Sequence, residues 1–149
     1  MSYVNLLIHA IVRTKASEPT LPADERITFL YKEMWGIINN KGGRLYRINS
    51  MPDHVHLLFT MPATISLSDF MQALKGSSSK RIKTVDGFEN FVAWGEGYAA
   101  FSKSMEDKQK IINYIINQQE HHKTVNFKDE YREFIREMGL ELDERDWGR

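Results

Sequence analysis

The chain has 149 residues, and its hydrophobic content of 42% is sufficient to bury the core of one ordinary domain. Its 20 basic and 20 acidic side chains give a net charge of +0, which argues against indiscriminate binding to nucleic acid. The absence of cysteine excludes disulfides, thiolate metal sites and cysteine nucleophiles, so any metal site must use nitrogen and oxygen ligands.

Alternation of side-chain type predicts that the chain begins with a strand. Apolar residues occupy every second position from Val4 to Val12, which would give this strand one purely apolar face. A proline-containing loop at residues 18–22 follows. Apolar residues then recur at helical spacing from Ile27 to Ile38, and the two glycines at 42 and 43 should end that helix.

A predicted antiparallel hairpin comes next, with strands at 44–50 and 53–61 joined through a Met-Pro-Asp turn. In its second strand, His54 and His56 alternate with apolar residues, so both imidazoles point to one face while the other face is core. Two histidines at this spacing lie close enough to share a metal ion.

The second half of the chain alternates helices with one more strand. Further elements are predicted as follows: a helix from Ser66 with Asp69 in its cap, a loop at 85–97, a strand at 98–102, a helix from Ser104 to about Gln119, and an amphipathic helix at 127–138 that ends at Gly139. Gly76 and the serines at 77–79 are expected to loosen the end of the first of these helices.

The order β-α-β-β-α-β followed by helices predicts an α+β, ferredoxin-like (RRM-like) fold. This fold is an antiparallel sheet with helices packed on one face, here with added C-terminal helices. Residues 1–149 are predicted to form a single domain, with 127–149 as a C-terminal helical and acidic tail. No apolar run approaches the roughly 20 residues of a membrane span, and the N-terminus lacks a secretory leader, so we expect a cytoplasmic protein with no membrane partner.

Charge is unevenly placed along the chain. Residues 127–149 contain eight acidic and five basic side chains, a net −3, which leaves +3 for the preceding 126 residues. Four basic side chains form a local cluster without an intervening acid: Lys75, Lys80, Arg81 and Lys83. These are candidate phosphate contacts, although a solvated helix end explains the composition equally well.

Reactive side chains are also expected on the helix after Ser104. At roughly 100° per residue, Tyr114 and Gln118 lie one turn apart and can share a site beside the apolar stripe. A tyrosine hydroxyl, with a free pKa of about 10, needs activation by a metal or a base before it can act as a nucleophile. Two imidazoles, an amide oxygen and open positions would suit Mg²⁺ or Mn²⁺, while the nitrogen ligands would equally accept Zn²⁺.

Two runs together resemble the motifs of the HUH single-strand transposases of the IS200/IS605 type, which have a single catalytic tyrosine. These runs are residues 51–58, Met-Pro-Asp-His-Val-His-Leu-Leu, and residues 114–118, Tyr-Ile-Ile-Asn-Gln. Both motifs, their order and their separation agree, and the resemblance extends from the first strand to the tyrosine helix. It implies that His54, His56 and Gln118 bind a divalent metal, Mg²⁺ or Mn²⁺, and that Tyr114 is the catalytic nucleophile.

The resemblance further implies DNA transposition through a covalent intermediate. The tyrosine would attack single-stranded DNA, forming a 5′-phosphotyrosine link and releasing a 3′-hydroxyl that later rejoins strands, without a nucleotide cofactor. The expected partners are single-stranded DNA with hairpin ends and a second copy of the chain, in a homodimer whose active sites can be shared between subunits. Two other functions stay open: an inactive or domesticated hairpin-DNA-binding protein, and a small zinc-binding structural domain.

Several further residues keep two interpretations each. His9 projects from the polar face of the first strand and could lie near the site. Asp53 could orient a ligand histidine or simply form the turn. His121 and His122 could be additional ligands or a cationic pair at a helix C-terminus. No chemistry is predicted for the acidic C-terminal segment.

Overall fold

The structure, a computed structural model, describes residues 1–149 and is built on one four-stranded antiparallel sheet. Its strands are β1 (Leu7–Arg13), β2 (Arg44–Met51), β3 (His54–Thr60) and β4 (Ala99–Lys103), in the spatial order β2-β3-β1-β4. This arrangement confirms the predicted α+β fold with a ferredoxin-like strand order. Of the two central strands, β1 carries His9 and β3 carries His54 and His56.

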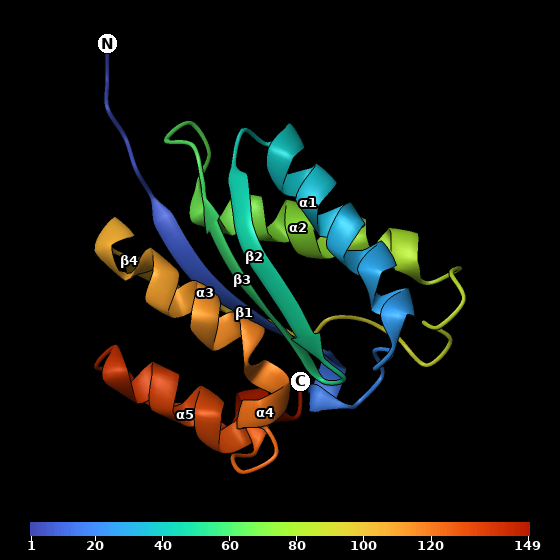
Figure 1. Cartoon of the computed structure of the whole chain (residues 1–149). Coiled ribbons are helices and arrows are strands. Elements are labelled where there is room, and N and C mark those ends of the chain that lie inside the picture. The colour runs from blue at the N-terminus through green and yellow to red at the C-terminus, as the bar shows by residue number, and fades with distance from the viewer.

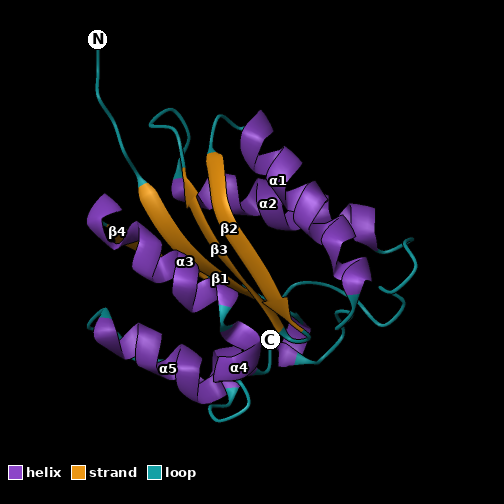
Figure 2. Cartoon of the chain, viewed as in Figure 1, coloured by secondary structure: helices purple, strands orange, loops and turns teal.

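Helices cover both faces of the sheet (Figures 1 and 2). The α-helices are α1 (Thr28–Asn40), α2 (Leu67–Ile82), α3 (Lys108–Ile116), α4 (Gln118–His121), α5 (Phe127–Glu137) and α6 (Glu144–Trp147), with short 3-10 helices at Lys15–Ser17, Glu25–Ile27 and Met105–Asp107. Helices α1 and α2 pack on one face, and the C-terminal helices α3, α4 and α5 lie over the other. None of the helices is long and apolar enough to cross a membrane.

The main hydrophobic core lies between the sheet and the α1/α2 layer. It contains the odd-numbered apolar residues of β3, such as Val55 and Phe59, together with Leu30 and Phe70 from the two helices. The even-numbered side chains of β3 point to the opposite face, as alternation along a strand requires. The predicted division into a core face and a histidine face is therefore present, and the histidine face is itself covered by helices.

Two predicted boundaries are wrong. The first strand begins at Leu7, because Val4 and its neighbours are exposed and unpaired with the sheet. The serines after Gly76 do not loosen a helix end but lie inside α2, which continues to Ile82. Ser78 explains why, since its hydroxyl is buried and accepts a hydrogen bond from the Trp94 indole at 3.0 Å.

Candidate active site and metal centre

The two histidines of β3 lie completely buried on the face covered by α3 and α5. His54 Nδ1 is 2.7 Å from Asp53 Oδ1, so the turn aspartate does orient this ring as well as shape the hairpin. The ring of His54 stacks on Phe127 of α5, with ring centroids 3.5 Å apart and an interplanar angle of 5°. These contacts fix the direction in which His54 Nε2 points.

His9 on β1 lies beside the second histidine. Antiparallel pairing of β1 with β3 brings His9 Nε2 to 2.9 Å from His56 Nδ1, which resolves the open position of His9 in favour of the site. Burial, with the neighbouring imidazole adding to it, lowers the pKa of His9 to about 3. Burial also lowers the pKa of His56 to about 4, so both rings are held neutral near physiological pH.

The helix predicted from Ser104 to Gln119 breaks at Asn117, between the tyrosine and the glutamine. Asn49 of β2 explains the break, because its amide donates to the Ile115 carbonyl at 2.7 Å and to Gln119 Oε1 at 2.8 Å. This side chain ties the end of α3 and the start of α4 to the sheet. As a result Gln118 is buried, and its Oε1 lies 3.2 Å from His54 Nε2.

Tyr114 and the sequence-predicted metal ligands converge in one cluster. The Tyr114 ring lies 5.8 Å from the ring of His56, centroid to centroid, within the same chain. His122 joins the cluster from the end of α4, with Nε2 at 3.0 Å from Gln118 Oε1 and Nδ1 at 2.8 Å from the Val125 carbonyl. His121 is about one third exposed and also contacts the cluster, with Nε2 at 3.2 Å from Glu130 Oε2.

Sequence reasoning missed the residue at the centre of this cluster, Glu130 of α5. Its carboxylate, in a side chain only 2% exposed, accepts hydrogen bonds from the Tyr114 hydroxyl and from Gln118 Nε2, the latter at 3.0 Å. Its Oε1 also lies 3.1 Å from His56 Nε2 and 3.3 Å from His122 Nε2. The prediction that the acidic C-terminal segment carries no chemistry is therefore wrong.

A signal for Glu130 was present in the helix pattern. Phe127, Tyr131 and Phe134 form the apolar side of α5, and Glu130 falls among them rather than on the charged side. A carboxylate on the buried stripe of an amphipathic helix requires a polar partner. The sequence cannot name that partner, because the packing of α5 on the sheet decides it.

The electrostatics of the cluster favour an anionic carboxylate and a protonated phenol. Burial alone would raise the pKa of the Glu130 carboxyl, but hydrogen bonds from His122 and His56 lower it well below its usual range. Burial, followed by the hydrogen bond to Glu130, raises the pKa of Tyr114 above its ordinary value. For His122, burial works to lower the pKa, while Glu130 outweighs it and gives a net increase.

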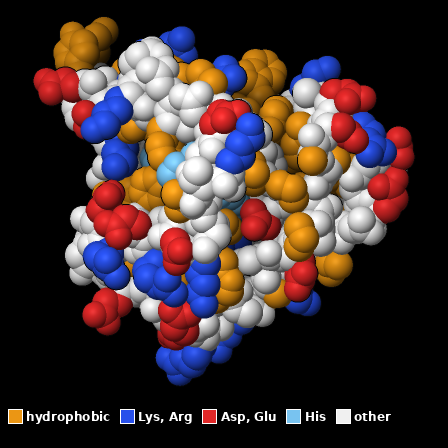
Figure 3. Space-filling view, turned by 60° about the horizontal axis from the view of Figure 1, so that its bottom comes forward, with side chains coloured by type: hydrophobic (Ala, Val, Ile, Leu, Met, Phe, Trp, Pro, Cys, Tyr) orange, Lys and Arg blue, Asp and Glu red, His pale blue; other side chains and the backbone are white.

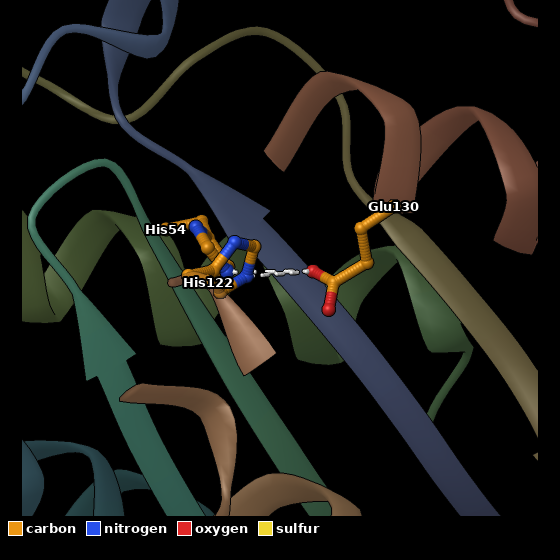
Figure 4. Close-up of side chains that lie close together, drawn as sticks. All are labelled: His54, His122 and Glu130. Carbon is orange, nitrogen blue, oxygen red and sulfur yellow. Dashed lines mark ion pairs between the residues drawn. The ribbon is translucent and has the colours of Figure 1, made fainter. Parts of the chain in front are cut away.

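A candidate ion site lies at the inner end of the cluster. Ligand atoms of His54, His122 and Glu130 all lie within 4.8 Å of one another, and Figure 4 shows both rings turned toward the carboxylate. Gln118 Oε1 adjoins both rings. Imidazole nitrogens with carboxylate and amide oxygens suit a divalent cation of the first transition row.

The outer side of Tyr114 opens into a cleft between α3 and α5. Basic side chains Lys103 and Lys110 line it together with acidic Glu133 and Glu137. In Figure 3, pale blue histidine atoms show at a hollow with charged side chains of both signs around it. The cleft therefore gives solvent access to the partly exposed tyrosine.

The predicted phosphate-contacting cluster, the α2 cluster, lies elsewhere, along α2 and at Lys83 just after its end, and α2 packs on the opposite face of the sheet. Lys75 Nζ donates to the carbonyls of Gly95 and Gly97, at 2.8 and 2.7 Å, and Arg81 pairs with Glu33 at 3.3 Å. Lys80 and Lys83 are exposed. The structure thus separates this cluster from the tyrosine, and its role in binding DNA stays a prediction.

Known proteins are similar to this chain in sequence and in fold. A profile of the family described as "Transposase IS200 like" matches residues 2–118. The ISDra2 transposase TnpA of Deinococcus radiodurans is 29% identical over 87 residues, which are 55% of this chain and 62% of that protein. The match therefore spans less than two thirds of this curated relative.

Two solved structures share the fold. A protein of Deinococcus radiodurans R1, described as a transposase, is 30% identical with a TM-score of 0.60, over 79% of this chain and 95% of that one. A REP-associated tyrosine transposase, solved bound to a REP hairpin, is 13% identical with a TM-score of 0.55, over 84% of this chain and 73% of that one.

Proposed function

Because the chain belongs to the IS200-like transposase family, we propose that it is a metal-dependent enzyme that cuts and rejoins single-stranded DNA through a phosphotyrosine. The observation that carries the proposal is the convergence of Tyr114 with His54, His56 and Gln118. These residues come from the sheet and from two helices, and they are up to 64 positions apart in the chain. A structural tyrosine would not require a buried imidazole pair and an amide at this place.

The proposed reaction begins with Tyr114. Its hydroxyl oxygen attacks a DNA phosphorus, the bond from that phosphorus to the 3′-oxygen breaks, and the downstream strand is left attached as a 5′-phosphotyrosine. Glu130 already accepts the phenolic hydrogen bond, which provides a route by which the proton can leave the nucleophile. The leaving 3′-oxygen takes a proton from solvent, and the ester keeps the bond energy for rejoining.

The donor set fits a divalent cation. We propose that His54, His56 and Gln118 hold Mg²⁺ or Mn²⁺, as the resemblance implies. The bound ion would polarise a phosphoryl oxygen of the scissile linkage. His54 is oriented for this purpose by Asp53, and His9 takes the other nitrogen of His56, so the Nε2 atoms of both rings point into the cluster.

The proposed substrate is single-stranded DNA that carries a hairpin, as found at the ends of a mobile element. The solved relative bound to a REP hairpin supports this substrate class through its shared fold. We also propose a homodimer. Within one chain Tyr114 contacts its own cluster, which supports catalysis by the tyrosine in cis.

An adduct assay tests the activity. The protein is incubated with Mn²⁺ and 3′-end-labelled single strands taken from the hairpin-bearing DNA that flanks its gene. A labelled protein band is expected, absent in Tyr114→Phe and retained in Tyr3→Phe, which changes a tyrosine that is 90% exposed. Hairpin binding without an adduct would support the non-cleaving alternative. The absence of both binding and adduct would refute the enzyme and the non-cleaving protein alike.

Mixed variants test the cis arrangement. Tyr114→Phe and His54→Asn each lack one half of the site, so a mixture that has exchanged subunits can regain activity only if the halves combine across the dimer. We expect no recovery. Adduct formation by the mixture would show that the tyrosine serves the partner's histidines instead.

A further inference from the structure

Two histidines of the cluster turn their Nε2 atoms toward the same point. His54 Nδ1 faces the Asp53 carboxylate at 2.7 Å, and His122 Nδ1 faces the Val125 carbonyl at 2.8 Å. Both partners can only accept hydrogen bonds, so each Nδ1 carries the ring hydrogen. In the neutral rings, each Nε2 therefore holds a lone pair.

These lone pairs meet other acceptors. Gln118 donates its amide to Glu130, which turns its Oε1 toward the two rings, at 3.2 Å from His54 Nε2 and 3.0 Å from His122 Nε2. The Glu130 Oε1 atom is 3.6 and 3.3 Å from the same two nitrogens. A buried group of facing acceptors is costly unless positive charge lies among them. One divalent cation satisfies all four atoms.

The spacing of these atoms also fits ligands of a single ion. Ligand nitrogens and oxygens lie about 2.0–2.2 Å from such an ion, so neighbouring ligands are separated by about 2.8–3.1 Å in octahedral and about 3.3–3.6 Å in tetrahedral geometry. The four separations above span 3.0 to 3.6 Å. His56 Nε2 lies 3.1 Å from the same Glu130 Oε1, and it can also be a ligand because His56 Nδ1 can donate its hydrogen to His9 Nε2.

We propose that His122 and Glu130, from the C-terminal part of the chain, are metal ligands that complete the centre formed by His54, His56 and Gln118. Both residues follow position 118, where the match to the family ends. Glu130 then bridges two parts of the site, binding the ion through Oε1 while Oε2 holds the Tyr114 hydroxyl. The proposal deepens the proposed function, since it rests on the same His54 and Gln118 ligands.

The ligand set defines the class of ion. Three imidazoles, an amide oxygen and a carboxylate form a nitrogen-rich site, which favours Mn²⁺, Co²⁺ or Zn²⁺ over Mg²⁺, a cation that prefers oxygen ligands and water. All five ligands come from one chain, so the monomer should bind the ion without DNA. Each nitrogen ligand also has its outer hydrogen bond in place.

Calorimetric titration of the full chain with Mn²⁺ or Zn²⁺ and with Mg²⁺, in the absence of DNA, tests the proposal. We expect one ion per chain, with Mg²⁺ binding more weakly. Glu130→Gln and His122→Asn should each weaken Mn²⁺ binding at least tenfold. The Co²⁺ complex should show a visible absorption band that changes in both variants. Glu133→Gln removes the same charge one turn further along α5, and its affinity for Mn²⁺ should stay within threefold of that of the unchanged protein.

The possible results separate this proposal from the proposed function. Affinity unchanged or increased in both Glu130→Gln and His122→Asn, with binding lost in His54→Asn, would overturn the added ligands while leaving the proposed His54 site intact. Binding that survives His54→Asn would refute the shared centre itself. Circular dichroism in chelator identifies a misfolded variant, and the change at His122, whose ring lies at the end of short α4, keeps the test decisive if Glu130→Gln fails to fold.

Discussion

The two faces of the sheet are equally buried along β1 and β3 but differ in chemistry. The face under α1 and α2 is an apolar cluster of 18 buried residues. The face under α3 and α5 has two small apolar clusters, of 5 and 4 buried residues, with the histidine, glutamine and glutamate network between them. Alternation along the same two strands supplies both sets of side chains.

This difference indicates a division of roles. Burial of apolar side chains stabilises a fold strongly, whereas buried hydrogen-bonded polar groups add only a modest net stability after the cost of losing water. The apolar face should therefore carry most of the stability, and the polar face should carry the binding and chemistry. If the division is real, changes on the apolar face should leave metal binding nearly intact, and changes on the polar face should leave most of the stability intact.

The largest expected effect is on the apolar face. Phe59 is fully buried and stacks on Phe70 with centroids 5.0 Å apart, so Phe59→Ala should lower the free energy of unfolding by about 3–5 kcal/mol. Urea denaturation in chelator measures this loss. Phe134→Ala is the matched change on the polar face and should cost less, because that ring is only partly buried. Equal losses would contradict the division.

Metal binding should stabilise the protein independently of the apolar face. Free Mn²⁺ at 100 times its dissociation constant should raise the free energy of unfolding by about 2.7 kcal/mol, provided the unfolded chain does not bind it. The same increase is expected in Phe59→Ala, because Phe59 lies on the other side of β3 from the ligands. His54→Asn should remove it. An increase much smaller in Phe59→Ala would show that the two faces are coupled.

Acid should act on the polar face in a defined pH range. His9 and His56 have folded pKa values lowered to about 3 and about 4, below their ordinary 6.5, so the unfolded chain binds protons first as pH falls. In chelator, the stability that these two rings contribute should be fully present above pH 6.5 and decrease toward pH 4.5, by up to about 1.4 kcal/mol per pH unit for each histidine. His122 has a raised pKa, so its contribution to stability is present below pH 6.5 and is lost as the pH rises above that value.

The control for this pH dependence is His9→Gln, which removes one of the two titrating rings. Its unfolding free energy should decrease about half as steeply between pH 6.5 and 4.5, as measured by urea denaturation at closely spaced pH values. The slope would be unchanged if the buried histidines did not cause it.

The sequence predicts the local parts of both faces better than their assembly. The alternation around His54 and His56 and the spacing from Tyr114 to Gln118 are visible because they depend on neighbours in the chain. The break at Asn117 is not visible, since a side chain of β2 causes it. The position of Glu130 depends in the same way on how α5 packs, so the helix is predicted while the contacts of its carboxylate are not.

The smallest expected effects concern DNA phosphates, for which the two faces offer separate sets of cations. Lys103 and Lys110 line the cleft beside Tyr114, and the α2 cluster lies on the far side of the sheet. We expect the cleft pair to contact the unpaired strand that is cut. We expect the α2 cluster to contact the hairpin. A hairpin stem and a single strand have different charge densities, so the salt dependence of binding can distinguish them.

Replacing Lys103 and Lys110 by Gln should lower the slope of log affinity against log salt by about 1.4, or about 0.7 for each lost contact with a single strand. Replacing Lys80, Arg81 and Lys83 should lower it by about 2.7 on hairpin DNA, at about 0.9 for each duplex contact, and should have no effect on an unpaired oligonucleotide. Lys75 is left unchanged because backbone carbonyls already hold its amine. An unaltered slope on hairpin DNA in the triple variant would refute the α2 cluster as a phosphate contact. A lower slope in the triple variant on both hairpin DNA and the unpaired oligonucleotide would show that the two faces bind one continuous strand.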